Sequence, residues 1–353
     1  MAKEDSDRAR TNRFGRRKIS SRLVLVILGI SVPLLALELG SYLIGHFSFE
    51  ADPMLTERRS SWAELRTFDP LLFWILKPDI EVRTIKTNSL GLRDEDNSAN
   101  KGDEFRILSL GESTTFGLWV KQEETYSTVL QGLMKDIGGR PVRVINAGIP
   151  GYSLFQGYIY LRHRGIDLKP DAVMIYFGHN DFLPVANLRK RDGLSTDATR
   201  GLNDWELFEH RQAFSWRLNY WLARRSNLMR SVMFVRQKKA VPEVIKANPD
   251  KVRVPREHRE TLLRMFHDFC LERDVEFIII IPWYLKFKKH ISLLRKFAAQ
   301  HNISIVDLPK ALKMPPKQKQ RYFRDSTHPN PKGHRAIAEA IADNLWQLWP
   351  DSR

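Results

Sequence analysis

The chain has 353 residues, an apolar fraction of 42% and a formal net charge of +16. This apolar fraction excludes a disordered protein, and the length suits one large domain or two smaller ones. The single cysteine, Cys270, excludes an intrachain disulfide and has the helical spacing of a core residue, while the positive charge favours a polyanionic partner.

The amino-terminal segment carries the features of a membrane anchor. Residues 1–22 form a leader with eight Lys or Arg and three acidic residues, and residues 23–37, LVLVILGISVPLLAL, carry no charge. If Glu38 is tolerated, the apolar stretch reaches Ile44, and a helix of that length spans hydrocarbon at about 1.5 Å per residue. We therefore expect an uncleaved anchor at 23–47, with the basic end cytoplasmic and the rest facing outward.

A cleaved signal peptide is the main alternative for this segment. The leader is long for a signal peptide, and no A-x-A cleavage site follows the apolar stretch. An outward orientation also makes nucleic acid an unexpected partner, although the positive charge alone would allow it.

After a polar connector at 48–104, the chain alternates between expected strands and helices. This alternation is typical of a parallel sheet in a three-layer α/β/α sandwich, here assigned to a domain at 105–353. We expect strands at 106–110, 142–146, 171–178, 276–281 and 303–307, and helices near 124–137, 155–165, 259–274, 291–300 and 332–348.

Four short strings follow expected strand ends or precede the last helix: GESTTFG, NAGIPGYS, GHND and DSTHPN. In parallel sheets, chemistry gathers beyond the carboxyl ends of the strands. The Asp-x-x-His step of Asp325 and His328 can place a carboxylate against one imidazole nitrogen, which leaves the other nitrogen facing a nucleophile such as Ser113. Gly151 offers an unobstructed backbone N–H and Asn180 a side-chain amide, both suited to stabilising an oxyanion.

These four strings resemble the sequence blocks of the SGNH, or GDSL-type, hydrolases, over roughly residues 106–181 and 255–348. The resemblance implies a flavodoxin-like sheet, with Ser113 as nucleophile, His328 as general base and then acid, and Asp325 as its orienting carboxylate. It also implies an oxyanion hole made by the Ser113 N–H, the Gly151 N–H and Asn180. Glu112 departs from the family pattern, which usually has Asp before the serine, and we expect it to support the turn. No cofactor and no metal are expected.

Residues 182–255 form an insert that is too long for an ordinary connection. Part of it, AFSWRLNYWLARRSNLMRSVMFVRQKK, mixes aromatic and basic residues at near-helical spacing. Three interpretations remain open: a helix that caps the core edge, a lid over the cleft, or a face that rests on an anionic bilayer. Trp205, Trp216 and Trp221 are also candidates for stacking on sugar rings.

The expected protein is a bacterial, single-span inner-membrane serine esterase whose catalytic domain faces the periplasm or the cell exterior. Its first expected substrate is an O-acyl, above all O-acetyl, ester of a cell-envelope or exported glycan. An acyltransferase onto a sugar hydroxyl and a lipid esterase are the alternatives with the same chemistry. A non-catalytic glycan- or lipid-binding scaffold is the alternative of another class.

Overall fold

A six-stranded sheet forms the centre of the larger of two compact units, which comprises Ala51–Arg217 and Arg236–Arg353. The computed structural model describes residues 21–48, 64–95, 101–185, 201–226, 228–229, 251–285 and 291–350. The strand order is β10-β9-β8-β5-β7-β6, and every pair is parallel except β6 with β7. The strands are β5 (Phe105–Gly111), β6 (Asp136–Ile137), β7 (Arg140–Gly148), β8 (Ala172–Tyr176), β9 (Glu276–Ile281) and β10 (Ser304–Asp307).

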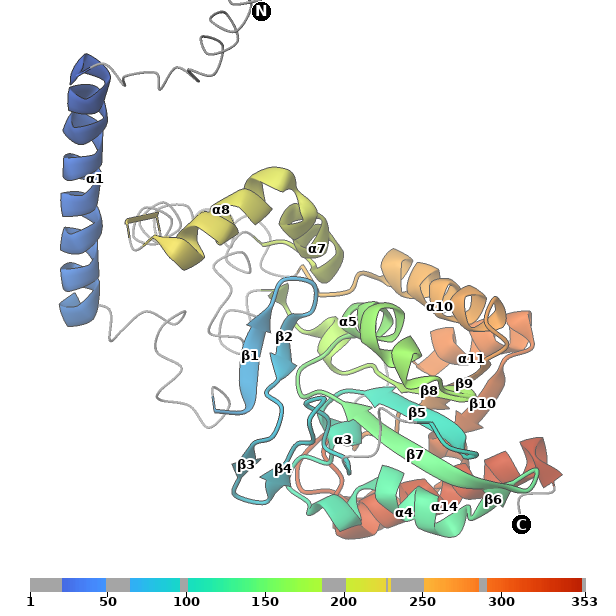
Figure 1. Cartoon of the computed structure of the whole chain (residues 1–353). Coiled ribbons are helices and arrows are strands. Elements are labelled where there is room, and N and C mark those ends of the chain that lie inside the picture. Colours follow the sequence, from blue (N-terminus) through green and yellow to red (C-terminus); the bar gives the residue numbers. More distant parts are fainter. Residues whose placement is uncertain are drawn as a thin grey trace, which may run out of the picture. The chain divides into compact units, whose positions relative to one another are not determined.

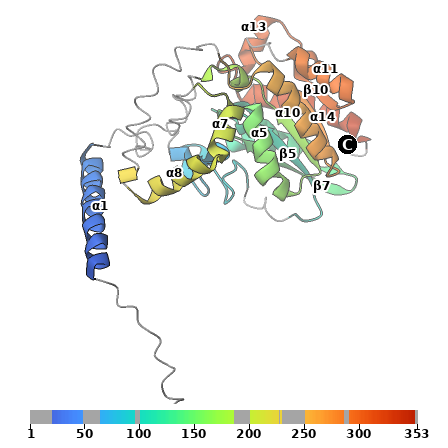
Figure 2. The same cartoon turned by 90° about the horizontal axis from the view of Figure 1, so that it is seen from above.

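Helices cover both faces of this sheet, as Figures 1 and 2 show. One face packs against α4 (Tyr126–Leu133) and α14 (Pro331–Leu348), and the other against α5 (Leu154–Tyr160), α10 (Arg256–Leu271) and α11 (Ile291–His301). All five residues of β8 are buried, because a strand covered on both faces has no solvent side. The predicted three-layer α/β sandwich is confirmed.

The element predicted at 124–137 differs from a single helix. The helix α4 ends at Leu133, and Ile137 pairs with Arg140 in a hairpin that turns at Gly138 and Gly139. Both glycines have positive φ, +60° and +77°, as a two-residue hairpin turn of this kind requires. The hairpin turn at Gly138 and Gly139 therefore ends the helix before Ile137, although the apolar periodicity continues to that residue. The predicted helix at 155–165 is α5 followed by a π-helical turn, Leu161–Gly165.

Part of the expected connector belongs to the core of the larger unit. It forms two hairpins, β1 (Arg66–Asp69) with β2 (Phe73–Leu76), and β3 (Glu81–Val82) with β4 (Ile85–Lys86). Leu72, Phe73 and Trp74 are at most 1% exposed and share a hydrophobic cluster with residues of β5 and β7. Residues 64–95 are thus more than a spacer, because burying this apolar patch stabilises the unit.

The smaller unit comprises Met1–Glu50 and Leu218–Val235. Its helix α1 (Ser21–Ser48) contains an 18-residue window, Leu25–Tyr42, with a mean hydropathy of 1.8, and is long and apolar enough to cross a membrane. The described part of the insert contains α7 (Asp204–Gln212) in the larger unit and α8 (Phe214–Arg225), whose residues from Leu218 onward belong to the smaller unit. Cys270 is free and buried in α10, as its spacing predicted.

Candidate active site

The turn after β5 presents Ser113 at the start of a short helix, α3 (Ser113–Phe116). Glu112 is extended, with φ −99° and ψ −151°, so the chain changes from strand to helix within one residue. The neighbouring strand end comes so close that a Cβ on Gly148 would collide with the Phe116 backbone. Glycine at this position therefore allows β7 to pack against the helix that carries Ser113.

Ser113, His328 and Asp325 form a hydrogen-bonded relay. The Ser113 Oγ lies 2.8 Å from His328 Nε2, and His328 Nδ1 lies 2.6 Å from Asp325 Oδ2. The other carboxylate oxygen, Asp325 Oδ1, accepts hydrogen bonds from the backbone N–H groups of Thr327 and His328, at 2.9 and 2.8 Å. The structure thus brings together three predicted residues that are up to 215 positions apart in the sequence.

The electrostatics of this relay keep Asp325 ionised. Its partial burial acts to raise the pKa, but the hydrogen bonds from Thr327 N and from His328, together with the charge of His328, lower the pKa to about 2. An anionic Asp325 holds the proton on His328 Nδ1, which leaves Nε2 as an acceptor for the Ser113 hydroxyl proton. Such an arrangement can activate a serine for attack on an acyl carbon.

Two backbone N–H groups are available beside Ser113. The Ser113 N–H begins α3 and has no intrahelical acceptor. The Gly151 N–H has no hydrogen-bond acceptor among the residues that the structure describes, and Gly151 has a φ of +87°. Since β5 and β7 pair in register up to Gly111 and Gly148, both donors follow adjacent strand ends.

Asn180 lies beside these donors, but its side-chain amide is engaged. Its Nδ2 donates to Glu112 Oε2 and, at 3.0 Å, to the Tyr152 carbonyl. The buried Glu112 also accepts hydrogen bonds from the Asn180 backbone N–H at 3.2 Å and from the Tyr284 hydroxyl at 2.5 Å. Glu112 therefore ties the nucleophile turn to the loop after β8, and an oxyanion role for Asn180 stays a prediction.

The carbonyls of Pro150 and Gly151, on either side of the Gly151 nitrogen, both accept hydrogen bonds from side chains that the sequence did not point to. The Trp74 indole Nε1 donates to the Pro150 carbonyl at 3.3 Å, and Arg253 Nη1 donates to the Gly151 carbonyl at 2.6 Å. In a trans peptide the carbonyl and the N–H point in opposite directions, so a donor on the Pro150 carbonyl orients the Gly151 N–H. Trp74 thus orients this N–H, and Arg253 holds the next peptide group, between Gly151 and Tyr152.

Arg253 is itself held by a buried ion pair with Asp204. The Nη2–Oδ2 distance is 2.7 Å, and the two side chains are 1% and 0% exposed. Asp204 also accepts a hydrogen bond from the Ser153 hydroxyl at 2.6 Å, and Arg253 Nη2 donates to Gln156 Oε1 at 2.6 Å. Because Asp204 and Arg253 come from the insert, two of its described segments are fastened to the Gly151 loop.

Two further titratable residues near the site have structural partners. Asp181 Oδ1 accepts the Leu154 N–H at 2.8 Å, and burial raises the pKa of its carboxyl group to about 7. His334 Nδ1 accepts the Tyr126 N–H at 3.1 Å, and burial lowers the pKa of His334 to about 3. Both side chains therefore hold backbone N–H groups of neighbouring helices, Asp181 at α5 and His334 at α4.

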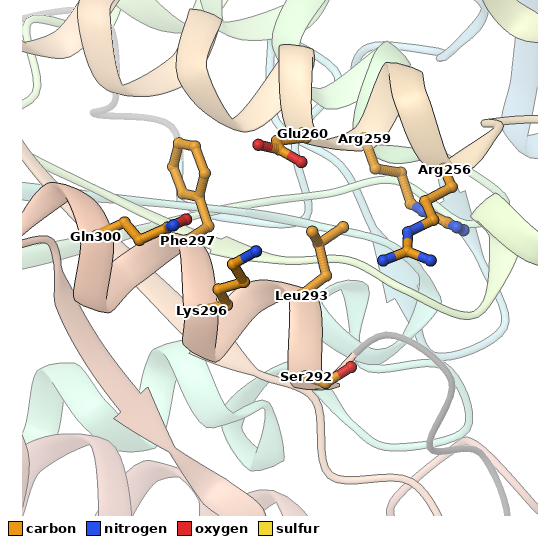
Figure 3. Close-up of a pocket in the computed structure, with 8 residues that line it drawn as sticks. All are labelled: Arg256, Arg259, Glu260, Ser292, Leu293, Lys296, Phe297 and Gln300. Atoms are coloured by element: carbon orange, nitrogen blue, oxygen red, sulfur yellow. The ribbon is translucent and has the colours of Figure 1, made fainter.

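A separate hollow of about 260 Å³ lies between α10 and α11 (Figure 3). No residue of the relay lines it, and one of its cations, Arg259, stacks on Phe182 at 3.9 Å. The hollow is lined by Arg256, Arg259, Glu260, Ser292, Leu293, Lys296, Phe297 and Gln300.

The tryptophans of the insert have different surroundings. Trp205 packs against Phe155, with ring centroids 5.6 Å apart, and its Nε1 donates to Glu209. Trp221 is 50% exposed and carries the guanidinium of Arg225 at 4.3 Å from its ring centroid. The side chain of Trp216 lies outside the described residues.

The chain matches one known protein family, over a stretch that contains Ser113, Gly151 and Asn180 but ends before Asp325 and His328. The family described as GDSL-like Lipase/Acylhydrolase matches residues 109–292, which is more than half of the chain. A search of curated proteins found no match to this chain. Among solved structures, a catalytic mutant of the acetylxylan esterase Axe2 from Geobacillus stearothermophilus is similar at 18% identity and a TM-score of 0.40, over 69% of this chain and 95% of that one. A putative lipolytic protein of the G-D-S-L family from Desulfitobacterium hafniense is similar at 14% identity and a TM-score of 0.39, over 69% and 100%.

Proposed function

The chain belongs to the GDSL-like lipase/acylhydrolase family, and on this premise we propose that it hydrolyses O-acetyl esters of cell-envelope glycans through an acyl-enzyme on Ser113. The observation that carries the proposal is the relay of Ser113 Oγ, His328 and Asp325, with contacts of 2.8 and 2.6 Å. The positive charge of the chain favours a substrate among envelope polyanions.

In the proposed reaction, Ser113 Oγ attacks the ester carbonyl carbon while His328 Nε2 takes the hydroxyl proton. The negative charge that develops on the carbonyl oxygen is stabilised by the N–H groups of Ser113 and Gly151. The intermediate collapses, the C–O bond to the sugar breaks, and His328 returns the proton to the leaving sugar oxygen. Water then attacks the acyl-enzyme with His328 as base, and acetate and free Ser113 result. A sugar hydroxyl in place of water would give acyl transfer by the same steps.

The first experiment is p-nitrophenyl acetate turnover by the full chain in detergent, beside Ser113→Ala. We expect this substitution to abolish turnover above the uncatalysed rate, because no other described group could form the acyl-enzyme by this relay. Ser292→Ala, an exposed serine in α11, is the matched control and should retain full activity. Turnover that survives in Ser113→Ala would contradict the proposal.

We further propose that α1 is a retained membrane anchor rather than a cleaved signal peptide. Its Glu38 Oε2 accepts hydrogen bonds from Ser226 Oγ at 2.7 Å and from the Leu228 N–H at 3.1 Å. A carboxylate in an apolar helix is costly unless it finds such partners. These contacts support retention, because cleavage after α1 would remove Glu38, the acceptor for the Ser226 hydroxyl and the Leu228 N–H.

Retention predicts that the membrane-extracted protein keeps its amino-terminal residues. Mass spectrometry of the intact chain after carbonate washing of membranes measures this directly. A mature chain that begins after residue 48 would contradict the anchor and leave the esterase proposal standing.

A further inference from the structure

One aromatic side chain of the larger unit is exposed where the surrounding chain is buried. Trp119 is 53% exposed, whereas its neighbours Leu118 and Val120 are 7% and 3% exposed. Its φ is +74°, a left-handed conformation that is strained for a bulky non-glycine residue. Folding alone does not favour a tryptophan at position 119, since a glycine would adopt the same backbone conformation without strain.

The strained loop is held from inside by a buried arginine. Arg93 is 1% exposed and donates through Nη1 to the carbonyls of Phe116 and Gly117, at 3.0 and 2.5 Å, and through Nη2 to Val120 at 2.6 Å. Desolvation lowers the pKa of Arg93 to about 10, so the guanidinium stays charged at neutral pH. The backbone before and after Trp119 is therefore held by Arg93, in a loop conformation that leaves the indole exposed.

The indole is connected to both catalytic loops. The Leu118 N–H donates to the Ser113 carbonyl at 3.0 Å, so the Trp119 loop is tied to the nucleophile. The Arg324 guanidinium lies over the Trp119 ring, 5.3 Å from its centroid, and the Arg324 N–H donates to the His328 carbonyl at 2.9 Å. Arg324 also directly precedes Asp325 in the chain.

We propose that Trp119 and Arg324 form a platform that binds a sugar ring of the ester-bearing glycan beside the relay. The proposal rests on the proposed esterase function and specifies its substrate as a glycan. An indole face suits the C–H face of a pyranose, and a guanidinium supplies several donors for ring hydroxyls or a uronate carboxylate. An acyl chain would instead favour an enclosed apolar groove, which an exposed indole with a charge on its ring does not provide.

The test separates sugar binding from ester chemistry in the full chain in detergent. Calorimetry with acetylated xylotetraose and acetylated trigalacturonate measures binding in a Ser113→Ala background, and p-nitrophenyl acetate measures turnover in the Ser113 chain. Trp119→Gly removes the ring and relieves the positive φ, so it should fold at least as well as the unmodified chain. We expect it to weaken oligosaccharide binding roughly ten-fold and to leave p-nitrophenyl acetate turnover within about two-fold.

Trp221→Ala is the matched control, because Trp221 is similarly exposed, at 50% against 53%, and also carries an arginine on its ring. It should leave both measurements unchanged, and Trp119→Phe should keep most of the binding. Equal binding by Trp119→Gly, absence of oligosaccharide binding by the Ser113→Ala chain, or an equal loss on both measurements would overturn the platform. Turnover of p-nitrophenyl palmitate is measured as well, and a loss confined to this long-chain ester would also overturn the platform, in favour of a lipid surface. The esterase proposal fails by a different result, p-nitrophenyl acetate turnover that survives in Ser113→Ala.

Discussion

The two halves of the candidate site are built in different ways. The Asp325–His328 pair of the relay is local in sequence and partly exposed to solvent: the two residues are three apart, and the Asp325 side chain is 46% exposed. The Gly151 side of the site is built from buried contacts between residues far apart in the sequence: Trp74 and an Arg253–Asp204 pair that is at most 1% exposed hold the Gly151 loop.

This difference predicts that substitutions in the two halves have different effects on turnover and on stability. An exposed relay carboxylate contributes little to folding, because solvent screens its charge, but the reaction needs it in every cycle. The buried pair beside Gly151 is different, since removal of one partner leaves an uncompensated charge in the core. We therefore expect changes in the relay to lower turnover without unfolding, and changes around Gly151 to affect stability as well.

Replacement of the relay carboxylate gives the largest expected effect. Asp325→Asn keeps the size of the side chain but loses the charge that holds the proton on His328 Nδ1, so kcat should fall by about 10²- to 10⁴-fold. The unfolding midpoint should hardly change. Asp343→Asn, at an exposed carboxylate of α14, serves as the control. A kcat within three-fold of the unmodified value would argue against the relay.

Breaking the buried pair should affect stability most. Arg253→Leu leaves Asp204 unpaired and should lower the free energy of unfolding by about 3–5 kcal/mol. Urea denaturation followed by tryptophan fluorescence measures this. Arg295→Leu breaks an ion pair with Asp307 in which the arginine side chain is 48% exposed, and should cost at most about 1 kcal/mol. Equal losses in the two variants would show that the Arg253 pair is not effectively buried.

Asp181 should make stability depend on pH between about 4 and 7. Burial, reinforced by the charge of Glu112, raises its folded pKa to about 7, against the Leu154 N–H bond and the charges of Arg259 and Arg253. The folded state then holds a proton that the unfolded state releases, so stability falls as pH rises through this window. Asp181→Asn should flatten that slope and be more stable at pH 8, by an amount on the order of 2 kcal/mol.

The exposed Asp343→Asn is the control for this pH profile and should follow the unmodified chain. Unfolding midpoints between pH 4 and pH 8 measure the slope. An Asp181→Asn profile parallel to that of the unmodified chain would contradict the raised pKa.

The smallest expected effect comes from the indole that orients Gly151. Trp74→Phe keeps a buried ring but loses the Nε1–H donor to the Pro150 carbonyl, and kcat should fall by roughly five-fold with KM unchanged. Phe73→Leu, in the same strand, reduces buried volume without removing that donor. If both variants lose kcat alike, packing rather than orientation would account for the role of Trp74.

Much of the fold was predictable because long apolar strands alternate with amphipathic helices. β9 was predicted at 276–281 and lies at Glu276–Ile281, because an apolar run covered on both faces has sharp polar ends. The helix at 124–137 was predicted too long, since periodicity does not register that Gly138 and Gly139 close a hairpin. The sequence predicts only a polar connector at 48–104, because its strands are short and its apolar patch is isolated in the sequence, whereas the structure buries that patch in the core.

From the sequence alone, the order of the four strings, three after strand ends and one before the last helix, predicted which residues would meet. The carboxyl ends of parallel strands share one edge of the sheet, so Ser113 and the Gly151 loop had to be neighbours. Only the tertiary structure decided how these groups are oriented. Glu112 engages the Asn180 amide, Trp74 and Arg253 hold the Gly151 loop, and Arg93 displays Trp119. These contacts join segments far apart in the chain, and their hydrogen bonds depend on side-chain directions and burial, which no local pattern encodes.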